Sequence, residues 1–521
     1  MADKKDESPI LKLNWFDRTV GFFSPRALLK RKKYKIYNAY LARKFEGADA
    51  GRRTKNWNTN NASANTETAI GLNLVRNRSR DLVRNNPYGA RGIQVITNNV
   101  VGKGITTQIK VDDNRKTDRR EKRLNNIWRA WAGTTACDFE GIHDFFGIQR
   151  LVMRAVVESG EVLVRIRRVG RQNAIGPDGI EREVPPIQLQ VLEADFLATT
   201  RVFTRLQNGN VIIQGVELDP QGKVVAYHIF QDHPGSLDPM PGSRFKTIRI
   251  PGNEILHVYR MDRPGQIRGV PWLAPIMLRL RDFDLYEDAQ LKRQQCAAMF
   301  TAFVHDIEGV DDDEETKEEI ELGEKMEPGM IEILPPGKDI TLSDPPGADN
   351  YGEYTSVVLH SIAAGLGITF ESLTGNLKQL SFSGGRLGFL EMNRNIEAWR
   401  SNIMLSKFMR PGFQWFVNGL DLIGENVSSI KGVFTPPRRE MIDPTREVPA
   451  LKTAIRSGIK TLSSVIRESG ADPDTHFEEM AADNAVLDSL GLILDSDPRR
   501  VNNGGSFNET KNETENETEN G

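Results

Sequence analysis

The stretch LTGNLKQLSFSGGRLGF, from Leu373 to Phe389, joins two segments whose apolar residues recur with the spacing of a helix. The segment before it repeats apolar residues at three- and four-residue steps, at Tyr351, Tyr354, Val358, Ile362 and Leu366. The segment after it does the same up to Pro411, at Met392, Ile396, Trp399 and Ile403. A connection of about a dozen residues is longer than packed helices need. The pattern therefore predicts two helices joined by a polar loop that has a function.

The loop is polar, contains paired glycines and lacks catalytic chemistry. Its polar residues and glycines are Lys378, Gln379, Ser381, Ser383, Gly384 and Gly385, followed by Arg386. Glycine allows backbone conformations that other residues avoid, so the composition suits a mobile segment that touches a polar surface. The loop offers neither a catalytic nucleophile nor a set of metal ligands.

The loop and its flanks resemble the tunnel loop and adjoining helices of portal proteins from lambda-like tailed phages. The resemblance is carried by IAAGLGITFESLTGNLKQLSFSGGRLGFLEMNR, which begins at Ile362. Further stretches resemble the family in the same order, so that the resemblance covers residues 70–495: Arg84–Ile105, Cys137–Arg165, Val191–Leu197, Gly215–Phe230, Gly265–Leu280 and Ile442–Asp474. Asn376 stands where the family has an aspartate, and Gly384 and Gly385 stand where it has paired serines. Both departures make the loop more flexible and less acidic.

The resemblance implies an α+β portal fold that assembles as a ring. It divides the chain into a basic N-terminal arm and linker (1–68), a wing (69–271), a first stem helix (272–299), a small α/β clip (300–350), a second stem helix (351–372), the tunnel loop (373–386), a wing helix and connection (387–440), crown-side helices (441–496) and a disordered acidic tail (497–521). By this resemblance five residues line the DNA channel, namely Lys378, Gln379, Ser381, Ser383 and Arg386. Gly384 and Gly385 form the hinge of the loop.

Residue patterns outside the loop agree with a mixed fold. Helical spacing covers residues 72–84, 88–101 and 119–131, and Trp128 and Trp131 are expected in the core rather than as stacking platforms. Between residues 161 and 260, alternation such as that of Val162, Val164 and Ile166 predicts antiparallel strands, with a hairpin turn at 219–222. Short strands are expected at 301–304 and 330–334, with an acidic helix at 311–325.

Two further helical regions complete the expectation. Residues 272–298 predict a long helix with four basic side chains among acidic ones, at Arg279, Arg281, Lys292 and Arg293. Such mixed charge is typical of a solvated or intersubunit face. Two short C-terminal helices are expected to begin at Asp443-Pro444 and Asp472-Pro473, where an acid caps the helix and proline occupies its first position. Gly458 and Gly470 are the predicted stops.

Composition limits the class of protein and its compartment. The 521 residues include two cysteines and no CxxC pair, so neither a disulfide framework nor a zinc site of that kind is expected. No apolar run is long enough to span a membrane. Residues 1–57 contain 15 Lys and Arg against 6 Asp and Glu, whereas residues 471–521 contain 3 against 13. The basic arm could contact nucleic acid or an acidic partner, or could simply be solvated, and the acidic tail is expected to be solvated.

The sequence gives no support for an enzyme, a metal or a cofactor. A phosphate-binding loop needs GxxxxGK[ST], and the Gly-Lys pairs at residues 102–103 and 337–338 lack its other residues. The acidic run at 311–315 has Thr316 where a calcium loop needs glycine. His143 and His360 are expected to be structural, because no nucleophile motif accompanies them.

The resemblance implies a portal protein of the virion, assembled in the host cytoplasm as a ring that is usually dodecameric. Its partners would be other copies of itself, double-stranded DNA without sequence specificity, the terminase large subunit, a head-tail adaptor and the major capsid protein. A sliding duplex needs weak phosphate contacts, because each bidentate base contact is worth about 1–3 kcal/mol. The modest basicity of the loop agrees with that need. The alternatives are a DNA-processing nuclease of the packaging machine and a shell or scaffold protein without a channel.

Overall fold

A computed structural model describes the chain at residues 61–112, 117–200, 203–237, 245–298, 302–306, 338–342, 351–378, 380–438 and 443–492, with a few isolated positions besides. The chain divides into two units, Met1–Ser63 and Ala64–Gly521, and every element named below belongs to the second. The predicted strand at 330–334, the acidic helix at 311–325 and the acidic tail lie outside the described residues, as do Gln379 and nearly all of the basic arm.

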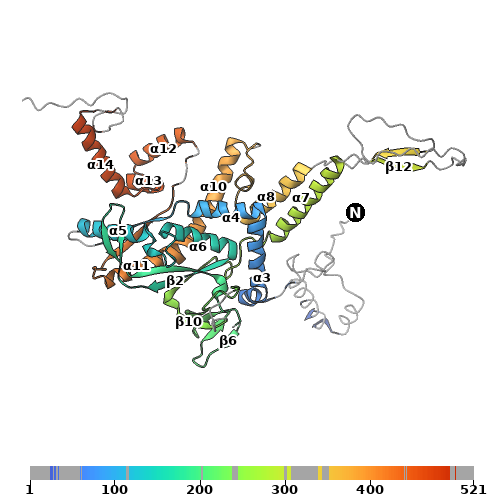
Figure 1. The fold of residues 1–521 in the computed structure, drawn as a ribbon, viewed down its shortest axis with the longest axis horizontal. Helices are drawn as coiled ribbons and strands as arrows, with labels where there is room; N and C mark the ends of the chain where they lie inside the picture. The colour runs from blue at the N-terminus through green and yellow to red at the C-terminus, as the bar shows by residue number, and fades with distance from the viewer. Residues whose placement is uncertain are drawn as a thin grey trace, which may run out of the picture. The chain divides into compact units, whose positions relative to one another are not determined.

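Four helices form the first part of the second unit, and the three predicted from periodicity are confirmed. They are α3 (Ala64–Asn85), α4 (Pro87–Val100), α5 (Thr117–Ala132) and α6 (Phe145–Ser159). Asn86 separates the first two because its side chain accepts a hydrogen bond from Gly89 N–H at 2.8 Å, while Pro87 occupies the first position of α4. Helix α4 packs on both α3 and α6. Figure 1 shows these helices together, in blue to teal.

The largest core is built around aromatic rings. Trp128 and Trp131 of α5 are buried, as predicted, and pack against Phe145 and Phe416, while Phe408 stacks on Phe145. The indole N–H of Trp131 donates to the carbonyl of Ile187 at 3.0 Å, which satisfies its one polar group. The core therefore joins the N-terminal helices to the helices that follow the loop.

The strands form antiparallel sheets, as predicted. A three-stranded sheet has the order β11 (Ile255–Tyr259), β2 (Glu161–Arg168), β5 (Ile187–Glu193), and a five-stranded sheet has the order β10 (Thr247–Pro251), β9 (Val224–Phe230), β8 (Val216–Leu218), β7 (Val211–Ile213), β6 (Phe203–Arg205). Two-stranded sheets pair β1 (Thr106–Val111) with β14 (Ile430–Thr435) and β3 (Gln172–Ile175) with β4 (Glu181–Val184). The predicted hairpin turn is confirmed, since Asp219 accepts backbone bonds from Gln221 and Lys223.

Strand β2 separates two cores, which its alternation alone did not indicate. Val162 and Val164 pack in the large core with the helices. Leu163, which alternates with these valines, is buried in a second core formed with the five-stranded sheet. Both faces are apolar at this end of the strand because each is covered by another layer.

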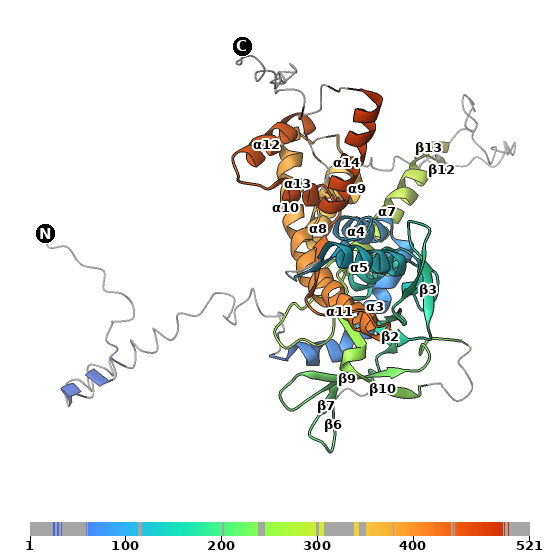
Figure 2. The ribbon, with the colours of Figure 1, turned by 90° about the vertical axis from the view of Figure 1, so that its left-hand side faces the viewer.

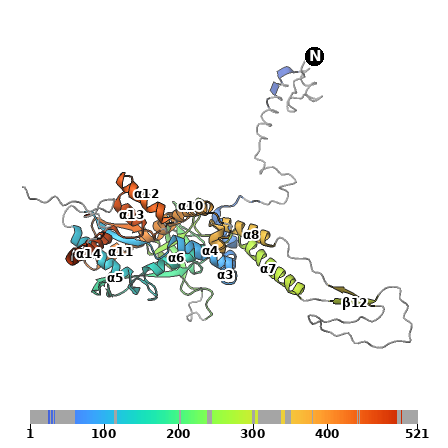
Figure 3. The same ribbon diagram turned by 90° about the horizontal axis from the view of Figure 1, so that it is seen from above.

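Two long helices extend from the core, and Figures 1 and 3 show them side by side. They are α7 (Met277–Ala298) and α8 (Tyr351–Leu366), and the strands β12 (Ala302–Asp306) and β13 (Lys338–Leu342) pair between them in the sequence. Helix α8 covers the apolar repeat from Tyr351 to Leu366 and ends before residue 372, the predicted end of the second stem helix, and α7 begins five residues later than predicted because residues 272–276 form turns. The helices approach closely near their bases, where a Cβ at Gly365 would lie 2.3 Å from Ile276.

The helix after the loop passes through Pro411, so the predicted stop there is wrong. Helix α9 (Phe370–Thr374) is followed by α10 (Phe382–Trp399), a π-helix (Arg400–Met409) and α11 (Arg410–Leu422). The N–H of Arg410 donates to the carbonyl of Leu405, five residues back. The backbone bonds of this π-helical turn reach five residues back, and the helix continues through Pro411 although proline has no N–H to donate.

The C-terminal region contains three helices rather than the two predicted. They are α12 (Pro444–Arg456), α13 (Leu462–Glu468) and α14 (Pro473–Leu490). Proline begins α12 and α14 as predicted, but the side chains of Asp443 and Asp472 make no capping bond to the backbone. Gly458 and Gly470 have the positive φ expected of stops. Figure 2 shows these helices, in orange to red. No helix among the described residues is both long enough and apolar enough to cross a membrane.

Candidate functional site

The loop between α8 and α10 is shorter than predicted. Helix α9 ends at Gly375, which has the left-handed φ of 71°, and α10 begins at Phe382, so only residues 375–381 connect them. Ser381 starts the helix early because its Oγ accepts a hydrogen bond from Gly384 N–H at 3.1 Å. The expected loop through Arg386, and up to Phe389, is therefore wrong in its second half, which is helical.

The residues predicted to contact DNA therefore lie partly in the connection and partly in the first turns of α10. Lys378 lies in the connection with an exposed side chain, and its N–H donates to the side chain of Asn376 at 3.1 Å. Ser381 is used as the helix cap. Ser383 and Arg386 lie in the first turns of α10 with exposed side chains. Two separate cations at the free end of a helix can make weak contacts with phosphates, but they form no cluster that could hold one tightly.

The predicted hinge glycines lie in the first turn of α10. Gly384 and Gly385 have helical conformation, and a third glycine, Gly388, follows one turn later. Glycine is about 0.8–1.0 kcal/mol less favourable than alanine at a helix position. Phe389 is the first residue of α10 that packs against the core and Met392 the first that is buried, whereas the earlier Phe382 and Leu387 are exposed. This end of the helix is therefore expected to be marginally stable.

The base of the segment is much better anchored than its tip. The ring of Phe370 stacks on that of His360 with centroids 4.0 Å apart, and His360 also bonds through Nδ1 to the carbonyl of Ser356 at 2.7 Å. Arg91 of α4 donates to the carbonyl of Ser372. Thr369 caps α9 through a bond from Ser372 N–H. His360 thus has the structural role that was predicted for it.

The tip also has exposed apolar side chains, which the sequence-based interpretation missed. They are Leu377, Leu380, Phe382 and Leu387, and Leu387 keeps 71% of its surface exposed. The sequence itself contained the evidence, because large apolar residues recur through the segment that was interpreted as polar. A surface of this kind is suited to contact with another protein surface rather than with phosphates.

The four predicted stem cations lie on two different faces of α7. At 3.6 residues per turn, Arg281 and Lys292 fall on one face, whereas Arg279 and Arg293 fall on another. Arg279 donates to the hydroxyl of Ser361 on α8, so it joins the two long helices. Arg281 and Lys292 are exposed. Nearby, burial raises the pKa of the Glu287 carboxyl, which accepts a weak bond from Tyr351 at 3.4 Å.

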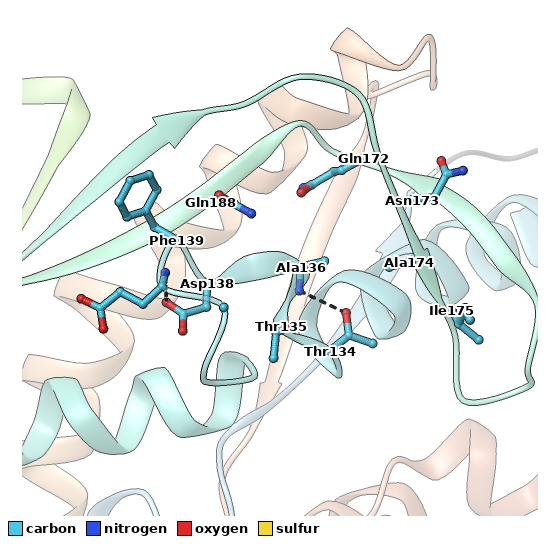
Figure 4. A pocket seen from close by; sticks show the side chains of 12 residues that line it. Thr134, Thr135, Ala136, Asp138, Phe139, Gln172, Asn173, Ala174, Ile175 and Gln188 are labelled. Atoms are coloured by element: carbon cyan, nitrogen blue, oxygen red, sulfur yellow. Dashed lines mark hydrogen bonds between the residues drawn. The ribbon is translucent and has the colours of Figure 1, made fainter.

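A polar pocket lies elsewhere, beside strands β3 and β5 (Figure 4). Its volume is about 530 Å³, and its lining includes Asp138, Phe139, Gln172 and Gln188. Asp138 accepts backbone bonds from residues 140, 142 and 143, so its carboxylate stabilises the turn.

One cluster among the described residues has the composition of a metal site. The ligand atoms of Glu193, Asp195 and His233 lie within 4.8 Å of one another. However, the guanidinium of Arg80 donates to Asp195 at 2.6 Å and to Glu193 at 3.1 Å. Ion pairing with this arginine accounts for the carboxylates without a metal. The thiol of Cys137 is also unsuited to chemistry, because burial raises its pKa.

The family described as "Phage portal protein, lambda family" matches residues 50–400, about two thirds of the chain. The chain belongs to the lambda family of phage portal proteins. The predicted resemblance and the predicted α+β portal fold are thereby confirmed. This portal protein is 27% identical over 481 residues to a probable portal protein of Halomonas phage phiHAP-1, covering 87% of this chain and 88% of the relative.

A second relative is the portal protein of Escherichia phage N15, which is 23% identical over 501 residues, covering 86% of this chain and 90% of the relative. Among solved structures, a chain of one described as "Neck of native GTA particle computed with C12 symmetry" matches with a TM-score of 0.43 and 14% identity. That match covers 75% of this portal protein and 93% of the other chain. The names of the two phage relatives are those of portal proteins and not of enzymes.

Proposed function

We propose that this chain forms the ring at the unique vertex of a phage capsid, and that double-stranded DNA passes through its channel during packaging, retention and ejection. Family membership supports the role. The observation that carries the channel proposal is the segment 375–391, which follows the anchored helices α8 and α9 and has an exposed, weakly supported tip. In this proposal the tip meets the duplex.

The chemistry of the tip suits a duplex that must slide. Lys378 and Arg386 each provide one exposed cation, and a single cation binds a phosphate weakly and in a salt-dependent way. Base-reading contacts would instead hold the duplex in register, since each is worth about 1–3 kcal/mol. Ser383 adds a hydroxyl that can bond to a phosphate, whereas Ser381 already caps the helix. Gln379 is proposed as a contact from its position in the sequence.

The apolar residues of the tip take a different role in this proposal. Leu377 and Leu387 cannot bind phosphates, and their exposure in one copy is costly. In a closed ring each subunit meets its neighbour through two different surfaces. We therefore assign these leucines to contact with the tip of the neighbouring copy, which leaves Lys378 and Arg386 for the DNA.

The wider role follows from the family. The proposed partners are the terminase large subunit, a head-tail adaptor and the major capsid protein, with assembly in the host cytoplasm and final location in the virion. The ring is proposed to contain twelve copies. The four cations of α7 are proposed to lie along the stem, where Arg281 and Lys292 remain available for a neighbouring copy or for DNA.

The test begins with images of purified protein, in which the proposal requires rings with an axial hole. The variant Lys378→Gln/Arg386→Gln should then form normal rings and particles that retain less DNA. The matched control is Arg394→Gln, which removes an exposed cation of α10 that pairs with Glu391 at 2.7 Å. Equal DNA retention by the double variant and the unchanged protein would argue against contact through the tip. Cleavage of DNA by the purified protein with magnesium would favour the nuclease alternative instead.

A further inference from the structure

The N-terminal half of α14 lies over a basic surface formed by β1 and α5. This basic surface consists of Lys110 on β1 with Lys122 and Arg129 on α5. Asp474 pairs with Lys110 and accepts a bond from Gln108 at 2.8 Å. Glu478, one helical turn further, pairs with Lys122 at 2.6 Å. The acidic face of α14 is therefore complementary in charge to the surface that it covers.

Arg129 completes the contact at the start of the helix. Its guanidinium donates to the hydroxyl of Thr475 at 3.0 Å and lies 3.9 Å from the carboxylate of Asp472. Most of these charged side chains remain substantially exposed to solvent; those of Lys122 and Glu478 are 70% and 61% exposed. Exposed pairs of this kind contribute about 0.2–1 kcal/mol each and weaken with added salt.

Apolar packing does little to hold α14 in place. Helix α12 has no buried residue, and Ile466 of α13 and Pro473 of α14 are the buried residues of the other two helices. A cavity of about 240 Å³ lies at the joint, between Trp128 and Phe146 on one side and Gly470 and Asp472 on the other. Because the joint is incompletely filled, charge pairs rather than buried apolar surface decide whether α14 stays closed.

We propose that α14 is a reversible, acidic cover over this basic surface, and that the surface binds the phosphates of double-stranded DNA when the cover opens. The carboxylates of Asp474 and Glu478 take the positions that phosphates would take, so DNA and α14 compete for the same cations. The segment around Gly470, with a φ of 82°, is the point about which α14 would move. This surface is separate from the tip at residues 375–391, and the inference does not depend on the channel.

The first experiment measures DNA binding by full-length rings of Asp474→Asn/Glu478→Gln. Loss of two exposed pairs should raise the open population by roughly 2- to 30-fold, and the affinity for duplex DNA should rise by the same factor while the open form is rare. The two cations that lose their carboxylate partners, Lys110 and Lys122, should also steepen the slope of log affinity against log salt by up to about 1.8. The control Glu479→Gln/Asp483→Asn makes the same charge change on α14 at residues that make no ion pair with α5 among the described contacts.

The second experiment measures opening directly, by hydrogen exchange in α14 and β1. Exchange should quicken with added salt and in Asp474→Lys, which faces Lys110 with a like charge. The swapped variant Lys110→Asp/Asp474→Lys should slow it again, because the pair is restored with reversed polarity. The proposal would be overturned if the exchange rate did not change with salt concentration. It would also be overturned if the control variant gained as much affinity for DNA as the test variant. Changing Lys378 should leave hydrogen exchange in α14 and β1 unchanged. The exchange result is therefore independent of whether the channel proposal holds.

Discussion

Replacing the paired glycines of α10 tests whether the proposed contact segment must be compliant. In Gly384→Ala/Gly385→Ala, each alanine should favour the helix by about 0.8–1.0 kcal/mol, or about 1.6–2 kcal/mol together. That gain is a shift of roughly 15- to 30-fold in the helix-to-loop equilibrium of the first turn. The added Cβ atoms fit tightly, since one lies 3.0 Å from Ser381 Oγ and the other 2.9 Å from Cδ2 of Leu380, so each requires a small shift of an exposed side chain.

Proline at the same two positions should have the opposite effect. Gly384 N–H donates to Ser381 Oγ, and Gly385 N–H donates to the carbonyl of Ser381 at 2.9 Å. Proline removes both donors, so the capped turn is lost and the helix must begin further along. The two variants therefore change the length of the loop in opposite directions without altering any charge.

The assay combines hydrogen exchange of the amides in residues 383–388 with DNA packaging and retention. We expect slower exchange and poorer packaging for the alanine pair, and intact rings with lower DNA retention for the proline pair. Gly71→Ala is the matched control, because Gly71 is helical and its Cβ would meet nothing within 4 Å. Unchanged exchange in the alanine pair would show that the first turn is already stable. Normal packaging and retention by both variants would refute the hinge role.

Three further outcomes concern the stability of the region predicted as the wing. Glu161→Gln should lower the free energy of unfolding by about 3–5 kcal/mol in urea titrations, because it leaves buried Arg76 and Arg268 uncompensated; a loss below about 1 kcal/mol would contradict this. Desolvation lowers the pKa of His257 below its value in the unfolded state, about 6.5, so the unfolded state binds more protons below that pH. The free energy of unfolding should therefore fall as the pH drops below about 6.5, and it should fall less in His257→Gln. Identical pH profiles for the two proteins would refute the assignment. Trp128→Ala should cost about 3–5 kcal/mol in the same titration.

The sequence was sufficient where helical periodicity and burial agreed. Helix α8 begins at the predicted residue and ends with the last residue of its apolar stripe, because Ile362 and Leu366 pack directly in the core. Trp128 and Trp131 were placed correctly for the same reason. Such positions need only the rule that an apolar stripe is buried, which the residues themselves display.

The start of α10 was missed because two local signals conflict there. Paired glycines favour a loop, whereas Ser381 followed by a free N–H three residues later favours a helix cap, and the cap prevails in the structure. The Pro411 error has another origin, since a proline stops an α-helix but not a helix that widens into a π-helical turn before it. Neither outcome can be derived from the propensity of single residues.

Other features depend on segments that are far apart in the chain. Leu163 alternates with the core-facing valines of β2, and its burial depends on the second sheet that covers it. Asp472 was expected to cap α14, but its carboxylate lies near Arg129 and accepts a bond from the hydroxyl of Thr475 instead. The basic surface under α14 joins residues more than 340 positions apart, so no local pattern could reveal it.

A buried contact between separate segments explains how the start of α7 is held in a fixed direction. Glu161, which is fully buried, accepts bonds from Arg76 of α3 at 2.6 Å and from Arg268, His257 and Gly269 N–H. These groups belong to α3, to β11 and to the segment that leads into α7. Arg268 and its neighbours hold the pKa of Glu161 well below its usual range against the effect of burial, so the charge persists at neutral pH.

A buried ionic network of this kind rarely stabilises a fold more than apolar side chains of the same volume would. The network instead fixes the orientation of the segments that it joins, because each donor reaches Glu161 from one angle only. The backbones add a second constraint, since a Cβ at Gly269 would lie 2.1 Å from the carbonyl oxygen of Gly160. The start of α7 is therefore fixed both by charge and by close packing, while the first turns of α10 have neither. A channel whose wall is rigid and whose contact segment can yield requires this difference between the two helices.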